Sequence, residues 1–142
     1  MDIEEYSKYH IYFYTENIPK LLEQCLRTAN FSSLADIGCG DGGLLYALNK
    51  RGYLKNKKVY AVDLSQTRVK RAREINNEFN CVVGDACNTP LPDRSIDFLV
   101  STQTIEHVPD DSKMIQEIAR LLSEDGVAYL STVFKRLVLL QV

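Results

Sequence analysis

Short apolar runs alternate with amphipathic segments along most of this chain, at spacings of about 20–30 residues. Such alternation is typical of βαβ units in a parallel, doubly wound sheet. The runs are apolar throughout, as expected where helices cover both faces of a sheet. We therefore predict an α/β fold with a mainly parallel sheet. Its strands are predicted at 34–37, 59–62, 80–83, 96–101 and 127–133, and its helices at 17–29, 44–51, 66–77 and 111–122.

Local signals predict where these elements begin. Asn17 can cap the first of these helices, with Pro19 in its first turn. Ser65 or Thr67 can cap the helix that starts near residue 66. The dipeptide at 125–126, Asp-Gly, predicts a turn before the fifth strand.

The first residues have a different pattern, because residues 3–14 mix aromatic and charged positions. They can form a lid over a site or a surface helix that buries its aromatic face, and we expect the surface helix. The predicted organisation is a single domain over 1–142, with a helical segment at 1–30, a core at 31–134 and a short tail at 135–142.

Composition narrows the class of protein. The chain has 142 residues and a net charge of −2, which indicates one domain and argues against a dedicated nucleic-acid or anionic-membrane binder. Its four cysteines have no CxxC spacing, so we expect reduced thiols and no metal site. The acidic N-terminus and the lack of an apolar run of about 18 residues favour a cytoplasmic protein without membrane association.

The segment 34–43, Leu-Ala-Asp-Ile-Gly-Cys-Gly-Asp-Gly-Gly, is a strand, a glycine turn and a helix start. Such a turn lets backbone approach a nucleotide closely. Gly38, Gly40 and Gly43 fit the GxGxxG dinucleotide pattern, with Asp63 as a ribose-binding acid. With Gly42, the same turn also fits a second pattern, that of an S-adenosylmethionine site preceded by an acid.

Acidic residues favour the second pattern. Asp36 lies within the end of the predicted strand, where a carboxylate suits a ligand with an ammonium and a sulfonium. Asp41 adds a negative charge that a pyrophosphate would disfavour. Asp85 follows the third predicted strand and can accept a hydrogen bond from the exocyclic amine of adenine.

Five segments in register resemble the motifs of class I, Rossmann-like S-adenosylmethionine-dependent methyltransferases of the small-molecule type. The resemblance implies that S-adenosylmethionine is the methyl donor and S-adenosylhomocysteine the product. It extends over residues 33–133. The matching segments are 36–42 (Asp-Ile-Gly-Cys-Gly-Asp-Gly), Asp63 after Val-Tyr-Ala-Val, 84–86 (Gly-Asp-Ala), 96–101 followed by 105–108, and 121–127.

The resemblance also implies roles for individual residues. Asp36 would hold the methionine ammonium, Asp63 the ribose hydroxyls, and His107 would act as a general base. The other residues implied in cofactor binding are Gly38, Cys39, Gly40, Gly42, Leu64, Asp85, Ala86, Thr102 and Gln103.

Each role has a structural alternative. Asp36 and Asp63 could cap the helices that follow them, Asp85 could form a turn, and Leu64 could pack in the core. His107 is more often a polar loop histidine than a base, and this is the interpretation that we favour.

The acceptor is less defined than the donor. Residues 101–104, Ser-Thr-Gln-Thr, lack the Asn/Asp-Pro-Pro-Tyr/Phe signature of enzymes that methylate amines of nucleic-acid bases. We therefore expect a small-molecule acceptor and no nucleic acid. Two other hypotheses stay open: a non-catalytic or partner-dependent S-adenosylmethionine-binding module and, less favoured, an NAD-dependent oxidoreductase.

The C-terminus departs from the family pattern. Only residues 134–142 follow the fifth predicted strand, too few for the family's last helix and antiparallel strand pair. We expect that pair to be lacking, which would leave a long apolar strand at the sheet edge. A homodimer or a partner subunit would then cover this edge.

Overall fold

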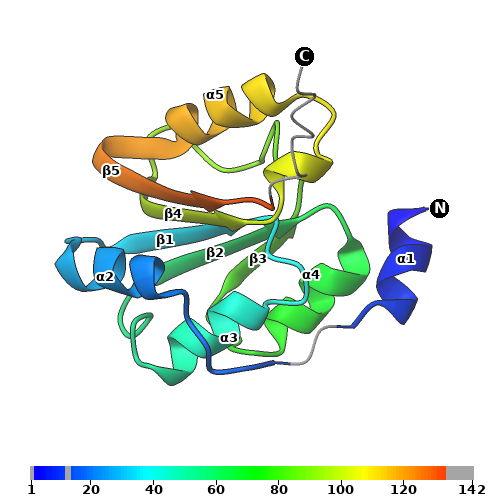
Figure 1. Ribbon diagram of the computed structural model, residues 1–142, viewed down its shortest axis with the longest axis horizontal. Helices are drawn as coiled ribbons and strands as arrows, with labels where there is room; N and C mark the ends of the chain where they lie inside the picture. The colour runs from blue at the N-terminus through cyan, green and yellow to red at the C-terminus, as the bar shows by residue number, and fades with distance from the viewer. Residues whose placement is uncertain (1, 12–13, 134–142) are drawn as a thin grey trace, which may run out of the picture.

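The computed structural model describes residues 2–11 and 14–133 of the chain. They form one five-stranded, all-parallel sheet in the order β3-β2-β1-β4-β5, which confirms the predicted α/β, Rossmann-like architecture (Figure 1). The strands are β1 (Ser33–Ile37), β2 (Lys58–Asp63), β3 (Asn80–Val83), β4 (Ile96–Thr102) and β5 (Leu122–Ser131).

Helices cover both faces of the sheet (Figure 1). On one face α2 (Lys20–Thr28), α3 (Gly43–Lys50) and α4 (Gln66–Arg73) pack on a cluster that includes Phe98 and Val100. On the other face α5 (Asp111–Leu121) packs on Ile96 and Leu99. Within β4, Phe98 and Val100 thus enter one cluster and Leu99 the other, which explains why the middle of this strand is continuously apolar. Two short helices complete the described chain, α1 (Ile3–Tyr9) and the 3₁₀ helix η1 (Ile105–His107).

Two helix boundaries differ from the prediction. Asn17 does not cap α2, because the N-cap is Pro19 in an extended conformation, with φ −54° and ψ 131°. The residue before a proline is also biased away from helical backbone, which keeps Ile18 outside the helix. The predicted helix 66–77 ends at Arg73, whereas Ser65 caps its start as expected.

The fifth strand begins earlier than predicted. β5 starts at Leu122, so the Asp125–Gly126 dipeptide lies within it rather than before it. The register with β4 shifts between the pairs Ile96–Leu122 and Phe98–Val127, so the strand pairing is irregular over this dipeptide. β5 pairs only with β4 in the described sheet and forms its edge. The tail at 135–142 lies outside the described residues.

The N-terminal helix does not bury an aromatic face. Among the described side chains of α1 only Ser7 is buried, while Tyr9 is 78% exposed. Tyr12 and Phe13 lie outside the described residues. α1 packs beside α4 through polar contacts (Figure 1), so the expectation of a buried aromatic face is wrong.

Candidate functional site

The glycine turn after β1 packs between helix α4 and the segment that follows β4. Gly38, Gly40 and Gly42 have φ of +78°, +55° and +87°, a region that side chains disfavour. A Cβ at Gly38 would collide with the side chain of Thr104, and one at Gly42 would lie 3.2 Å from Ala72 of α4. Gly40 is different, because a Cβ there would contact only one described atom, at 4.0 Å. The turn is therefore open at Gly40 and closed on both sides of it.

Asp63, at the end of β2, holds this turn in place. Its Oδ2 accepts a hydrogen bond from the amide of Gly40 at 2.9 Å, and its Oδ1 accepts from the amide of Ser65 at 2.9 Å. Ser65, not Asp63, caps α4, so the capping alternative for Asp63 is wrong. Each carboxylate oxygen has two lone pairs, so both can accept a further hydrogen bond, as a cis-diol would require.

Asp36 is a buried acid at the carboxyl end of β1. It is 1% exposed, and its Oδ1 has no hydrogen-bond partner among the described residues. Burial, together with the nearby charge of Asp63, raises the pKa of Asp36 from 3.8 to about 7. The N-cap of α3 is Gly42, and no side chain of the described chain caps that helix, so the capping alternative for Asp36 is wrong.

The side chain of Asp41 is turned toward the protein interior. It is buried, and Nη1 of Arg71 donates a hydrogen bond to its Oδ1 at 2.9 Å. The same nitrogen donates to the carbonyl of Ser7 in α1 at 2.8 Å, and the hydroxyl of Tyr14 donates to the carbonyl of Asp41 at 2.7 Å. The negative charge of Asp41 is thus compensated within the protein. The pairing with Arg71 offsets the charge that was expected to disfavour a pyrophosphate.

The residues assigned to adenine surround the same strand ends. Leu64 is 58% exposed, so the alternative of ordinary core packing is wrong. Asp85 is exposed, and its Oδ1 accepts from the amide of Cys87 at 2.8 Å, which is the predicted turn-forming interaction. Ala86 packs against the cluster under α5. The amide of Gly84 donates to the carbonyl of Asp63, which ties the ends of β2 and β3 together.

The thiol of Cys39 is buried in the protein core. The side chain is 7% exposed and belongs to the core cluster under α3 and α4. Burial, with the charges of Asp36 and Asp63, raises the pKa of this thiol well above its usual range. The thiol is therefore a neutral core group, and the four cysteines of the chain are all free.

The segment after β4 approaches the turn from the other side. Thr104 donates from Oγ1 to the carbonyl of Ile37 at 3.4 Å, close to Gly38. Gln103 is exposed with φ +53°, and its amide donates to the carbonyl of Ser131 at 2.8 Å. Thr102 is partly buried at the end of β4. The chain at 102–104 thus connects the glycine turn to the end of β5.

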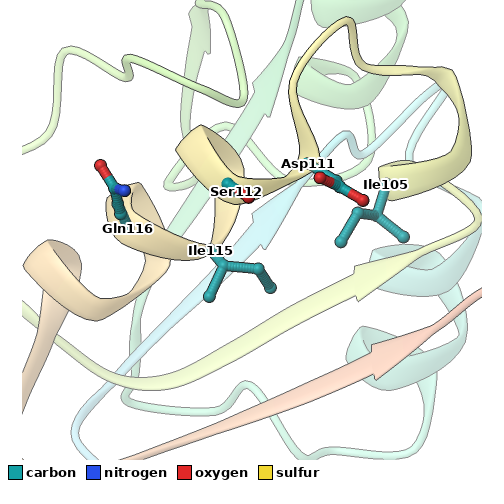
Figure 2. Close-up of a pocket in the computed structure, with 5 residues that line it drawn as sticks. All are labelled: Ile105, Asp111, Ser112, Ile115 and Gln116. Atoms are coloured by element: carbon teal, nitrogen blue, oxygen red, sulfur yellow. The ribbon is translucent and has the colours of Figure 1, made fainter.

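His107 lies on η1 with its side chain exposed. The neighbouring Glu106 accepts at Oε2 from the hydroxyl of Thr132 at 2.9 Å, so η1 is fixed to the chain that follows β5. An open pocket of about 400 Å³ lies beside η1, and in Figure 2 the side chains of Ile105 and Ile115 reach it from η1 and α5. Asp111, Ser112 and Gln116 complete its lining.

Two residues near the turn were missed by the sequence analysis. Thr104 closes over Gly38, and Arg68 of α4 provides the atom that lies 4.0 Å from a Cβ at Gly40. Neither belongs to a pattern in the sequence, since both approach the turn from elements distant in the chain. Within residues 2–11 and 14–133, no group of three or more His, Cys, Asp or Glu side chains is arranged to hold a metal ion.

The comparison with protein families agrees with this geometry. Residues 35–130 match the profile of the methyltransferase domain family. The chain belongs to this family. It is a class I S-adenosylmethionine-dependent methyltransferase domain, and the methyl donor of the family is S-adenosylmethionine, as predicted. The same described residues contain no helix long and apolar enough to cross a membrane.

Similar proteins include several named methyltransferases. Norajmaline N-methyltransferase of Rauvolfia serpentina is 30% identical over 116 residues, which cover 72% of this chain and 39% of that protein. Ubiquinone biosynthesis O-methyltransferase of Leptothrix cholodnii is 28% identical over 79% of this chain and 48% of its own length. This methyltransferase domain thus spans less than half of either curated relative.

A solved structure shares the fold as well. A SAM-dependent methyltransferase from Aquifex aeolicus superposes with a TM-score of 0.65 and 27% identity, covering 78% of this chain and 60% of that one.

Proposed function

We propose that this methyltransferase domain transfers a methyl group from S-adenosylmethionine to a small-molecule acceptor. The observation that supports it most is Asp36, a buried acid whose Oδ1 has no hydrogen-bond donor among the described residues. A buried carboxylate is costly unless a donor or a cation reaches it. The ammonium of the methionine end of the donor is such a cation. The open backbone at Gly40 provides room beside it.

The other donor contacts follow along the sheet edge. Asp63 has lone pairs left for the two ribose hydroxyls, and the exposed Leu64 offers an apolar face to adenine. Asp85 and Ala86 would contact the adenine edge, and the 102–103 backbone the methionine end. When bound, the donor supplies a methyl group already activated by a sulfonium. The protein's task is then to bind and orient the two reactants.

This site can lower the activation free energy more by orienting the reactants than by general-base catalysis. Alignment of two reactants can lower the barrier by roughly 7–11 kcal/mol, whereas a general base lowers it by about 3–5 kcal/mol. We propose the pocket beside η1 as the acceptor side of the site, because η1 follows β4 at the carboxyl edge of the sheet. His107 is proposed as the general base for acceptors that must lose a proton.

His107→Asn tests this assignment. It should lower kcat about 10²–10⁴-fold, with donor affinity unchanged. An unchanged kcat would show that orientation alone is sufficient.

We also propose that a second copy of this domain covers the edge of the sheet. In the described sheet β5 pairs only with β4, and its Val127 is 44% and Leu130 37% exposed. Unpaired apolar edges tend to recruit another strand. Sedimentation tests whether β5 drives self-association, and Leu130→Lys should then shift the protein to monomer. A monomer at high concentration before substitution would exclude the homodimer.

The deciding experiment for the main proposal is calorimetry with S-adenosylmethionine, S-adenosylhomocysteine and NAD. Binding of the two sulfur compounds without NAD is expected, whereas binding of NAD alone would refute the proposal. Formation of S-adenosylhomocysteine in the presence of hydroxyl and amine compounds would then identify the acceptor class. The free thiols support a proposed cytoplasmic location.

A further inference from the structure

Arg71 of α4 connects the glycine turn to the N-terminal helix α1. Its Nη1 donates a hydrogen bond to Oδ1 of Asp41 at 2.9 Å and another to the carbonyl of Ser7 in α1 at 2.8 Å. The side chain of Arg71 is 23% exposed and that of Asp41 is 1% exposed, so the ion pair is largely shielded from water. One guanidinium nitrogen therefore holds two segments that are distant in the chain.

The turn needs such an anchor because its glycines restrict the backbone very little. The three glycines in the segment 38–42 all have positive φ, and glycine adopts more backbone conformations than any other residue. The two side chains between them, those of Cys39 and Asp41, are buried. Cys39 packs in the apolar core, whereas Asp41 is held by a charged partner from another element. The conformation of the second half of the turn therefore depends on Arg71.

Tyr14 holds the backbone of Asp41, as Arg71 holds its side chain. The hydroxyl of Tyr14 donates to the carbonyl of Asp41 at 2.7 Å, and its ring stacks on Tyr46 of α3 with the centroids 4.9 Å apart. The peptide that joins Asp41 to Gly42 is thus fixed from two directions. A turn that is already ordered can bind a ligand without the entropic cost of ordering it on binding.

Stability alone explains this ion pair poorly. Shielding two charges from water costs about as much free energy as their attraction returns, so such a pair often adds little to the stability of the fold. Removing one partner is costly, because the other charge then stays buried without a counter-charge. On a glycine turn, however, the pair also selects one backbone conformation among many. The ion pair is therefore better explained by the turn conformation that it selects.

We propose that Arg71 is a positioning residue for the methyl donor, because it fixes the glycine turn through Asp41 and couples the turn to α1 through Ser7. The proposal rests on the proposed function, since the turn is part of the proposed donor site. Arg71 acts through the backbone of the turn and needs no contact with the donor. Coupling between two sites is reciprocal, so donor binding should also stabilise the docked position of α1.

Binding of S-adenosylhomocysteine, measured by calorimetry beside urea unfolding, tests the positioning role. Arg71→Met should weaken binding about tenfold. It should also lower the urea midpoint, because Asp41 is left buried without its counter-charge. Adding Asp41→Asn removes that charge, so the urea midpoint should recover while binding stays about tenfold weaker. Lys70→Met removes an exposed cation from the same helix and should change neither quantity.

The outcomes distinguish positioning from a purely structural role. Affinity that recovers together with the urea midpoint in the double variant would overturn the proposal, since stability alone would then explain the loss. Unchanged affinity in Arg71→Met would overturn it as well. If the unsubstituted protein does not bind S-adenosylhomocysteine at all, the proposed function itself fails.

Hydrogen exchange tests the coupling to α1. Saturation with S-adenosylhomocysteine should slow exchange of the α1 amides at least about fivefold in the unsubstituted protein. Arg71→Met at saturation should lose this protection. Exchange that is equally fast with and without the ligand would overturn the link to α1. Protection that persists in Arg71→Met would overturn the part assigned to Arg71.

Discussion

The amide of Gly40 donates a hydrogen bond to Oδ2 of Asp63 at 2.9 Å, so the acid at the end of β2 fixes the glycine turn after β1. The other oxygen of the same carboxylate fixes the start of α4 through Ser65. Asp63 thus organises two backbone segments and, in the proposed function, also binds the ribose. Loss of this carboxylate should affect both the shape of the turn and the affinity for the donor.

Asp63→Ala is expected to weaken binding of S-adenosylhomocysteine at least about tenfold, the loss of one charge-assisted hydrogen bond. Titration calorimetry measures this directly. Asp125→Ala, which removes an exposed carboxylate on β5, should leave the affinity unchanged. Unchanged affinity in the Asp63 variant would contradict its role at the ribose.

We expect Asp36 to lower the stability of the ligand-free protein and to strengthen binding of the donor. Its folded pKa of about 7 exceeds the ordinary value of 3.8, so the unfolded chain loses this proton first as the pH rises. The ligand-free protein should therefore lose stability from about pH 4 to about pH 7 and stay less stable above that window.

Asp36→Asn should remove this part of the pH dependence and stabilise the ligand-free protein at pH 8 by about 2–4 kcal/mol. The same substitution should weaken the donor at least about tenfold, because the ammonium loses its carboxylate. Urea unfolding between pH 4 and pH 8 measures the first effect and calorimetry the second. A variant with the same pH slope as the original protein would show that Asp36 does not titrate in this range.

The contact of Gly38 with Thr104 predicts coupling between two segments. Gly38→Ala should destabilise the protein by about 2–4 kcal/mol, the sum of left-handed backbone strain and overpacking. Thr104→Gly removes the colliding side chain and should recover about 1–2 kcal/mol in the double variant. Chemical denaturation of the four proteins gives the coupling energy. Strictly additive effects would mean that the two residues do not meet.

A partly buried ion pair between Glu117 and Arg120 on α5 predicts that the protein loses stability in acid. Glu117 accepts from Arg120 and from the amide and hydroxyl of Thr89, and these hydrogen bonds lower the pKa of Glu117 from 4.5 to about 2. The stability that this carboxylate contributes is present above about pH 4.5 and is lost as the pH falls through about 2.

Glu117→Gln should cost about 2 kcal/mol at pH 7 and reduce the acid dependence of unfolding. Glu124→Gln, an exposed position, is the control and should change neither. An unchanged acid transition in the Glu117 variant would mean that other carboxylates control it. Since Thr89 belongs to the loop that follows Asp85, the variant should also increase proteolysis of that loop.

Most of the sheet could be predicted from the sequence, because buried parallel strands are nearly continuous apolar runs bounded by turn residues. β1 begins one residue before the predicted range, β2 extends one residue beyond it at each end, and β3 matches it. The start of β5 was predicted five residues late, because the irregular part of this strand contains an Asp-Gly dipeptide that is typical of a turn. α2 was started too early, because Asn17 is a good cap only when the next residues can be helical.

The site was predicted in part. The glycines and the acids at three successive strand ends follow from local motifs, so the sequence could identify them. The pairing of Asp41 with Arg71 and the approach of Arg68 and Thr104 to the turn depend on residues 28–66 positions apart. Such contacts form only when the elements pack, and no local spacing indicates them.

The strand order separates the proposed donor side of the site from the proposed acceptor side. The acids assigned to the donor lie at the carboxyl ends of β1, β2 and β3, whereas η1 and the open pocket follow β4, on the other half of the sheet. Substitutions at Ile105 or Ile115 can therefore reshape the acceptor side while the donor side stays intact. A library confined to the segment from η1 to the first turns of α5 would sample new acceptors on a constant methyl-donor module.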